Sequence, residues 1–250
     1  MRLSLWKTIF LNFSMLPFKQ AIKLPIICTR YTYFYSMPGR IVLTEPAHFG
    51  MIRLGFCDED MITPRTTRTL LQIEGKCVMG ARVRLGNGVV LRIEPGATLT
   101  LGNEVSIGTK AKVICYDSIS IGRQTQVTCE CQLIDTNFHY MIKDDGTVVE
   151  PNKEITIGAH CWIGNRSSIM KGTVLPDYTT VASNSLCNKR YDIPQRSIIA
   201  GMPAKLVKSG VRRCWFDEED EIKSLKTRQL AMGGGNRLTV NWLRKFAMVA

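Results

Sequence analysis

A six-residue period runs through the middle of this chain and restricts its fold more than any other feature. From about Ile73 to Leu186 an aliphatic residue recurs at six-residue steps, often followed by glycine, with a small or β-branched residue four places on. The hexads begin at Ile73, Leu101, Ile107, Ile121, Ile157, Ile163, Ile169, Leu175 and Val181. Steps of eight residues, such as Leu85 to Ile93, interrupt the period without ending it. A repeat this short indicates a stack of identical small units.

One hexad can form only a short strand and a turn, so its apolar side chain becomes buried only when units stack. Three hexads per coil give a triangular prism with the aliphatic residues inside. Cys77, Cys131 and Cys161 occupy the small position four residues after the aliphatic one. We therefore expect them to pack inward as small hydrophobic residues.

The repeat breaks once over a long stretch. After Leu133 the pattern fails, and it returns only at Ile155. We expect a loop, residues 138–154, to leave the prism here, and its only histidine is His139. Stacked repeats commonly carry function on such insertions, because the rigid coils hold the root of the loop.

Composition excludes some classes of protein. No stretch approaches the roughly 20 apolar residues of a membrane-spanning helix, which excludes an integral channel or transporter. The nine cysteines include no C-x-x-C pair, which argues against a zinc finger and favours a reducing, cytoplasmic setting. The net charge of +12 favours anionic partners, but no nucleic-acid motif is present and we expect no nucleic acid to bind.

The order of motifs resembles the hexapeptide-repeat acyltransferase superfamily, and within it the maltose-type and polysaccharide O-acetyltransferases. The resemblance rests on an Asp-x-x-x-His stretch, the hexads that follow the loop, and a closing A-G-x-P-A. These are Asp135 to His139, Ile155-Thr156-Ile157-Gly158, Cys161-Trp162-Ile163-Gly164 and Ala200-Gly201-Met202-Pro203-Ala204. It implies a β fold, a left-handed parallel β-helix, over residues 73–208. We expect a basic aromatic segment (1–50) and a lead-in (51–72) before it, and a C-terminal helix and tail (209–250) after it.

The resemblance also implies an activity: transfer of acetyl from acetyl-CoA to a sugar hydroxyl, in surface polysaccharide biosynthesis. The position that matches the family's catalytic base is His139. The chemistry fits, because an imidazole can remove the proton of a hydroxyl as the hydroxyl attacks a thioester. Asp135 could orient that imidazole, or it could be a solvated turn residue.

In the family the coenzyme lies in a groove between neighbouring prisms of a homotrimer, and no metal takes part. Carried over by position, Trp162 and Asn165 flank the pantetheine, while Ser183, Asn188 and Lys189 line the groove farther along. Lys189 and Lys205 are candidates for the coenzyme phosphates, although basic residues there could equally form a solvated face. The sequence departs from the family with Ala182-Ser183-Asn184-Ser185 in place of the usual small G-A-G-S, and with Asn188 where threonine is common.

The sequence is also compatible with other functions. The same fold supports N-acetylation of an amino sugar, and the prism could be a non-catalytic scaffold or binding protein. A metal-dependent hydratase would need three converging histidines. The chain has only His48, His139 and His160, and their places in the repeat do not converge.

The two ends of the chain differ from the repeat. Residues 1–44 contain no acidic residue, and Trp6, Phe10 and Phe13 follow helical spacing. This amphipathic segment either packs on the main domain or another subunit, or makes peripheral contact with an anionic membrane, at the inner face. Ile222, Leu225 and Leu230 predict a helix after the coils. Gly233 to Gly235 would end it, and the tail at 236–250 has no predicted function.

Overall fold

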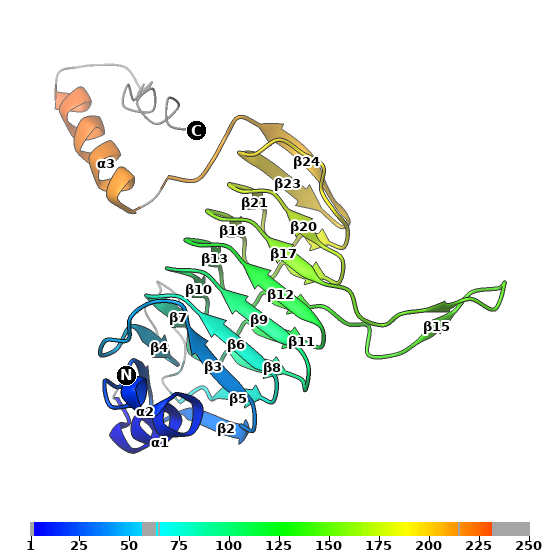
Figure 1. Cartoon of the computed structure of the whole chain (residues 1–250). Helices are drawn as coiled ribbons and strands as arrows, with labels where there is room; N and C mark the ends of the chain where they lie inside the picture. Colours follow the sequence, from blue (N-terminus) through cyan, green and yellow to red (C-terminus); the bar gives the residue numbers. More distant parts are fainter. Residues whose placement is uncertain (1–2, 57–63, 65, 215, 232–250) are drawn as a thin grey trace. The chain divides into compact units, whose positions relative to one another are not determined.

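The structure is a computed structural model that describes residues 3–56, 64, 66–214 and 216–231. The chain divides into two compact units, Met1–Arg212 and Arg213–Ala250. In the first unit, short strands stack into three sheets (Figure 1), here called faces 1, 2 and 3.

Face 1 contains, in stacking order, β1 (Ile26–Cys28), β4 (Ile52–Leu54), β7 (Val83–Leu85), β10 (Ser106–Ile107), β13 (Gln126–Val127), β18 (Trp162–Ile163), β21 (Thr180–Val181), β23 (Ser197–Gly201) and β24 (Ala204–Ser209). Face 2 contains β2 (Thr32–Ser36), β5 (Thr69–Ile73), β8 (Val90–Ile93), β11 (Lys112–Cys115), β14 (Gln132–Ile134), β19 (Ser168–Met170) and β22 (Leu186–Cys187). Face 3 contains β3 (Arg40–Leu43), β6 (Lys76–Met79), β9 (Thr98–Leu101), β12 (Ser118–Ile121), β17 (Ile155–Ile157) and β20 (Val174–Leu175).

The chain visits faces 1, 2 and 3 in turn, and each strand pairs in parallel with the strand one coil away. In face 2, for example, Val113 is in register with Leu91 on one side and Leu133 on the other. Only β24 runs antiparallel to its neighbour in face 1, closing the far end of that sheet. The stack of parallel coils predicted from the hexads is confirmed, and it agrees with the left-handed parallel β-helix that the family resemblance implies.

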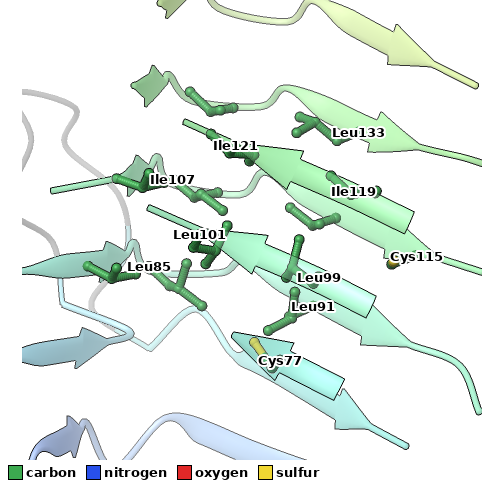
Figure 2. Close-up of a cluster of buried hydrophobic side chains, with 14 of the residues drawn as sticks. Cys77, Leu85, Leu91, Leu99, Leu101, Ile107, Cys115, Ile119, Ile121 and Leu133 are labelled. Carbon is green, nitrogen blue, oxygen red and sulfur yellow. The ribbon is translucent and has the colours of Figure 1, made fainter. Parts of the chain in front are cut away.

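The interior is a column of aliphatic side chains (Figure 2). Leu85 on face 1 and Leu99 and Ile121 on face 3 are each at most 1% exposed. The cysteines at the small position, Cys77, Cys131 and Cys161, are buried as predicted. Burial raises the pKa of the Cys77 thiol to about 12, which keeps it protonated.

Polar side chains at the corners connect the coils. The carboxylate of Glu104 accepts hydrogen bonds from Arg82, one coil before it, and from Gln124, one coil after it. At another corner Glu130 pairs with Arg166 at 2.6 Å and with Lys110 at 4.0 Å. These exposed pairs add modest stability individually, but they repeat along the stack.

The stacked strands begin nearer the N-terminus than the repeat predicts. The first coil starts with β1 at Ile26, whereas the hexads become recognisable only at Ile73. The early coils have no six-residue spacing, because their connections are long and unequal: residues 55–68 separate β4 from β5. The strands β1 to β5 are therefore continuous with the sheets of the prism.

Two short helices, α1 (Leu5–Met15) and α2 (Phe18–Ala21), cover the first coil. Two buried polar residues of α1 bond the open edge of β1, which is the terminal strand of face 1 among the described residues. The Asn12 amide donates to Ile26 O at 2.7 Å and accepts from Ile26 N at 3.1 Å. Thr8 Oγ1 accepts from Cys28 N at 3.2 Å. The helix thus protects an edge that would otherwise pair with another chain.

The second unit contains the expected C-terminal helix, α3 (Phe216–Ala231), in which Lys223 pairs with Glu219 at 3.4 Å. The predicted glycine break at 233–235 and the tail at 236–250 lie outside the described residues. Within the described residues, no helix combines the length and the hydropathy needed to cross a bilayer.

Candidate active site

The predicted loop leaves face 2 after β14 and returns to face 3 at β17, so it lies at the edge between these two faces. It forms a hairpin of two short strands, β15 (Met141–Ile142) and β16 (Val148–Val149), which projects from the stack (Figure 1). The root of the loop is fixed by backbone bonds: Lys153 N donates to Asp135 O, and Asn137 N donates to Pro151 O, both at 2.9 Å. These bonds hold the base of the loop, and residues farther along it are available to contact a ligand.

His139 lies just beyond this fixed root, and its side chain is exposed. The preceding residue, Phe138, adopts a left-handed backbone with φ of 63°. Its ring packs edge to face on Tyr116 at 5.6 Å, and its N–H donates to Thr136 Oγ1 at 2.9 Å. The position of His139 is thus set by its neighbour, while its imidazole remains accessible to a substrate.

Asp135 is fully buried, so the interpretation of this residue as a solvated turn residue is wrong. Its Oδ1 accepts from Tyr116 N at 2.7 Å and its Oδ2 from Asp117 N at 2.9 Å. Burial raises the pKa of this carboxyl despite the two donors. Both carboxylate oxygens of Asp135 therefore bond this turn rather than the His139 imidazole. In this structure Asp135 ties the root of the loop to the preceding coil.

The residues predicted to contact the coenzyme are all exposed, and they occupy different edges of the prism. Asn165 and Ser183 follow β18 and β21 at the edge between faces 1 and 2, and Trp162 lies beside them on face 1. Asn165 O accepts from Asn184 N at 2.9 Å, so the two turns stack directly. This edge presents an aromatic ring next to polar turns.

Asn188 and Lys189 follow β22 at the other edge, between faces 2 and 3. The Lys189 ammonium lies 5.6 Å from the centre of the Tyr191 ring. They stand two strand steps beyond the loop root (β14 to β19 to β22), about 10 Å along the stack. Lys205 is exposed on β24, in the outermost pair of face 1.

Sequence comparison connects this geometry to known proteins. A relative in Escherichia coli, provisionally named the lipopolysaccharide biosynthesis O-acetyl transferase WbbJ, is 25% identical over 145 residues, covering 54% of this chain and 72% of its own. A relative in Mycobacterium tuberculosis, provisionally named an acetyltransferase, is 31% identical over 166 residues, covering 64% of this chain. This chain spans only 50% of the length of that second relative. Both relatives carry names of acetyltransferases.

The solved structure of the polySia specific acetyltransferase NeuO aligns with 81% of this chain and 98% of its own chain, at 16% identity and a TM-score of 0.48. No protein-family model matches the chain.

The candidate residues of this chain separate into two groups. His139, Asn188 and Lys189 belong to the edge between faces 2 and 3, and Asn165 and Ser183 to the edge between faces 1 and 2. A six-residue extended segment, such as that from 165 to 171 across face 2, spans about 20 Å. One small group cannot touch Asn165 and His139 of the same copy simultaneously.

The sequence prediction missed the groups that hold His139 in place. Tyr116 supports Phe138 from the preceding coil, and the Arg92 guanidinium lies 5.2 Å from the Tyr116 ring. It also missed the apolar surface of the hairpin, where Tyr140 and Ile142 are 65% and 73% exposed. The run of apolar residues at 140–142, together with Val148 and Val149, was the available signal.

Proposed function

We propose that this protein transfers an acetyl group from acetyl-CoA to a hydroxyl of a saccharide, in surface polysaccharide biosynthesis. The observation that carries the proposal is the exposed imidazole of His139 on a loop whose root is bonded into the coils. The names of the relatives support the reaction class, since one is named for O-acetyl transfer in lipopolysaccharide biosynthesis and the other for acetyl transfer.

In the proposed reaction, His139 accepts the proton of the sugar hydroxyl while its oxygen attacks the thioester carbonyl. A carbon–oxygen bond forms, and the tetrahedral intermediate then expels the coenzyme sulfur as the carbon–sulfur bond breaks. The imidazolium returns the proton to that thiolate, so the products are an acetyl ester and free coenzyme thiol. Backbone N–H groups at a coil edge would stabilise the transient oxyanion. The proposal involves no metal ion, because a thioester is already reactive toward a deprotonating hydroxyl.

We place the coenzyme between the edge that joins faces 1 and 2 and the edge that joins faces 2 and 3. We assign Trp162 and Asn165 to the pantetheine, Ser183 and Asn188 to the groove beyond it, and the ammonium groups of Lys189 and Lys205 to the phosphates. Because the two edges are about 20 Å apart in one copy, we propose a homotrimer in which the donor edge of one prism faces the His139 edge of the next. Asp135 acts there as a positioning residue, through the root of the loop.

The buried free thiols fit a reducing compartment, and we include a cytoplasmic location in the proposal.

The test is release of coenzyme thiol from acetyl-CoA in the presence of a panel of saccharides. We compare the wild type with His139→Ala and with His48→Ala, which removes an exposed histidine from the connection between β3 and β4. Loss of a general base lowers kcat by about 10²- to 10⁴-fold, and we expect this for His139→Ala alone. Full turnover by His139→Ala would remove this residue from the mechanism.

The same assay separates the proposal from N-acetylation of an amino sugar. Hydroxylamine cleaves acetyl esters but leaves acetyl amides intact, so products are treated with it before mass spectrometry. Loss of the acetyl mass supports the hydroxyl acceptor. A resistant product formed only from amino sugars would assign the reaction to nitrogen.

A further inference from the structure

The helix α1 at the N-terminal end of the stack is apolar on two opposite sides. Leu11 and Met15 are buried against the first coil. On the outer side Trp6, Phe10 and Phe13 are 75%, 43% and 46% exposed. A helix that is apolar all round is normally covered on all sides. Apart from the Phe10 ring, which stacks on Phe34 at 5.5 Å, the outer side therefore lacks a covering within the described part of this unit.

The exposed apolar surface continues into α2. The rings of Phe13 and Phe18 pack edge to face at 5.9 Å, and Phe18 is 70% exposed. Ile22, directly after α2, is 54% exposed. We call the surface formed by Trp6, Phe10, Phe13, Phe18 and Ile22 the aromatic cap.

Cations surround the aromatic cap, and no acidic residue offsets them. Lys19, Lys23 and Arg30 are exposed, and residues 1–44 contain no Asp or Glu. Lys7 adds positive charge beneath them: its ammonium donates to Arg30 O at 2.7 Å and Thr32 O at 2.6 Å. Large aromatic rings beside lysines are the side-chain set that binds an anionic membrane surface.

The charge decides between a lipid surface and a second copy of this chain. Two aromatic caps placed face to face would bring Lys19 and Lys23 against the same residues, with no acid in either segment to pair with them. Anionic phosphate headgroups supply the missing charge, and the acyl boundary accepts the rings. We propose that the aromatic cap is a peripheral binding site for anionic lipid bilayers.

This site places the loop at a defined height above the lipid. The first coil and the loop are four strand steps apart in face 2 (β2 to β5 to β8 to β11 to β14), about 19 Å. Resting on the proposed function, the placement specifies the acceptor as a saccharide carried on a membrane lipid, whose sugar extends from the surface toward His139. Binding of the cap to lipid does not itself depend on catalysis.

The test is sedimentation of the full chain with vesicles, without substrates. One set is pure phosphatidylcholine and the other contains about 30 mol% phosphatidylglycerol, which supplies the anionic headgroup. The aromatic variant is Trp6→Ser, Phe13→Ser and Phe18→Ser combined, and the charge variant is Lys19→Glu with Lys23→Glu. The matched control is Leu206→Ser with Val207→Ser, which changes exposed apolar residues of β24. Thermal unfolding confirms that each variant is folded.

We expect the wild type and the control to bind the anionic vesicles at least about tenfold more tightly than the neutral ones. Both cap variants should lose at least about tenfold in that affinity, and added salt should weaken wild-type binding. Equal binding by the wild type and the aromatic variant would overturn the proposal. So would wild-type self-association that the aromatic variant abolishes, without vesicle binding. Because acetyl transfer is not measured, a failure here leaves the proposed reaction to its own test.

Discussion

At the scale of single residues, Asp135 bonds groups other than the one that its spacing in the sequence suggests. It lies four residues before His139, yet its oxygens bond the backbone at Tyr116 and Asp117. A fully buried carboxylate is costly even when two donors face it, because burial disfavours the charged form. The two bonds hold the root of the loop in place, and burial raises the pKa of the Asp135 carboxyl.

Replacement of this carboxylate has an effect on stability that depends on pH. In Asp135→Asn the amide nitrogen must face one of the two backbone N–H donors, and we expect a loss of about 1–3 kcal/mol in the free energy of unfolding at low pH. The ordinary pKa of this carboxyl is 3.8, and burial raises it in the folded protein. As the pH rises above 3.8, Asp135 therefore loses its proton at a lower pH in the unfolded protein than in the folded one. Folding of the wild type therefore becomes less favourable as pH rises toward the raised pKa, and the variant lacks this decrease.

The measurement is urea unfolding of both proteins across this pH range. The stability difference between wild type and Asp135→Asn should shrink as pH rises. Asp117→Asn, at a neighbouring exposed position, serves as the control for a general loss of negative charge. A difference that grows with pH would mean that the two donors outweigh burial and that the pKa is lowered.

At the scale of the coil, the close approach of turns in successive coils restricts which residues fit in those turns. A Cβ placed on Gly122 would lie 2.5 Å from Ala159 N and 2.6 Å from Gly158 C, both in the backbone of the next coil. These atoms are held by the parallel pairing of β12 with β17. Glycine is needed at Gly122 for space rather than for a left-handed conformation.

We expect Gly122→Ala to lower the free energy of unfolding by about 1–3 kcal/mol, because backbone cannot move aside as a flexible side chain can. Gly146→Ala is the matched substitution: it lies in the hairpin turn with open space around it, although its φ is +80°. Strain there can be released by local opening of the hairpin, so global stability should change by less than about 0.5 kcal/mol. Equal losses in denaturant unfolding would show that the coils tolerate the extra methyl group.

The sequence predicts those coils in which the chain repeats regularly. From Ile73 on, each hexad marks one face, so the prism and the break after Leu133 are predictable. The coils at 26–72 are not, because their connections differ in length and carry no period. The contact of Phe138 with Tyr116 depends on which turns stack across 22 residues of chain. The burial of Asp135 depends on the same stacking, and a six-residue period alone does not specify it.

At the scale of the whole molecule, the separation of the two candidate edges determines what a single copy can do. The proposed donor residues Trp162 and Asn165 and the candidate base His139 lie on opposite sides of face 2. If the site forms between neighbouring copies, two inactive variants should restore each other. In a cyclic assembly each interface takes one edge from each of two copies.

Co-expression of His139→Ala with the double variant Trp162→Ala, Asn165→Ala tests this arrangement. Random association at equal amounts leaves the His139 edge intact in half of the copies and the donor edge intact in half. About a quarter of interfaces then carry both intact edges, and turnover should recover to roughly that fraction of the wild type. A site contained in one copy allows no recovery, because every copy then carries one defective edge. Native mass spectrometry of the same mixture measures the number of copies, and differently tagged chains verify that mixed assemblies formed.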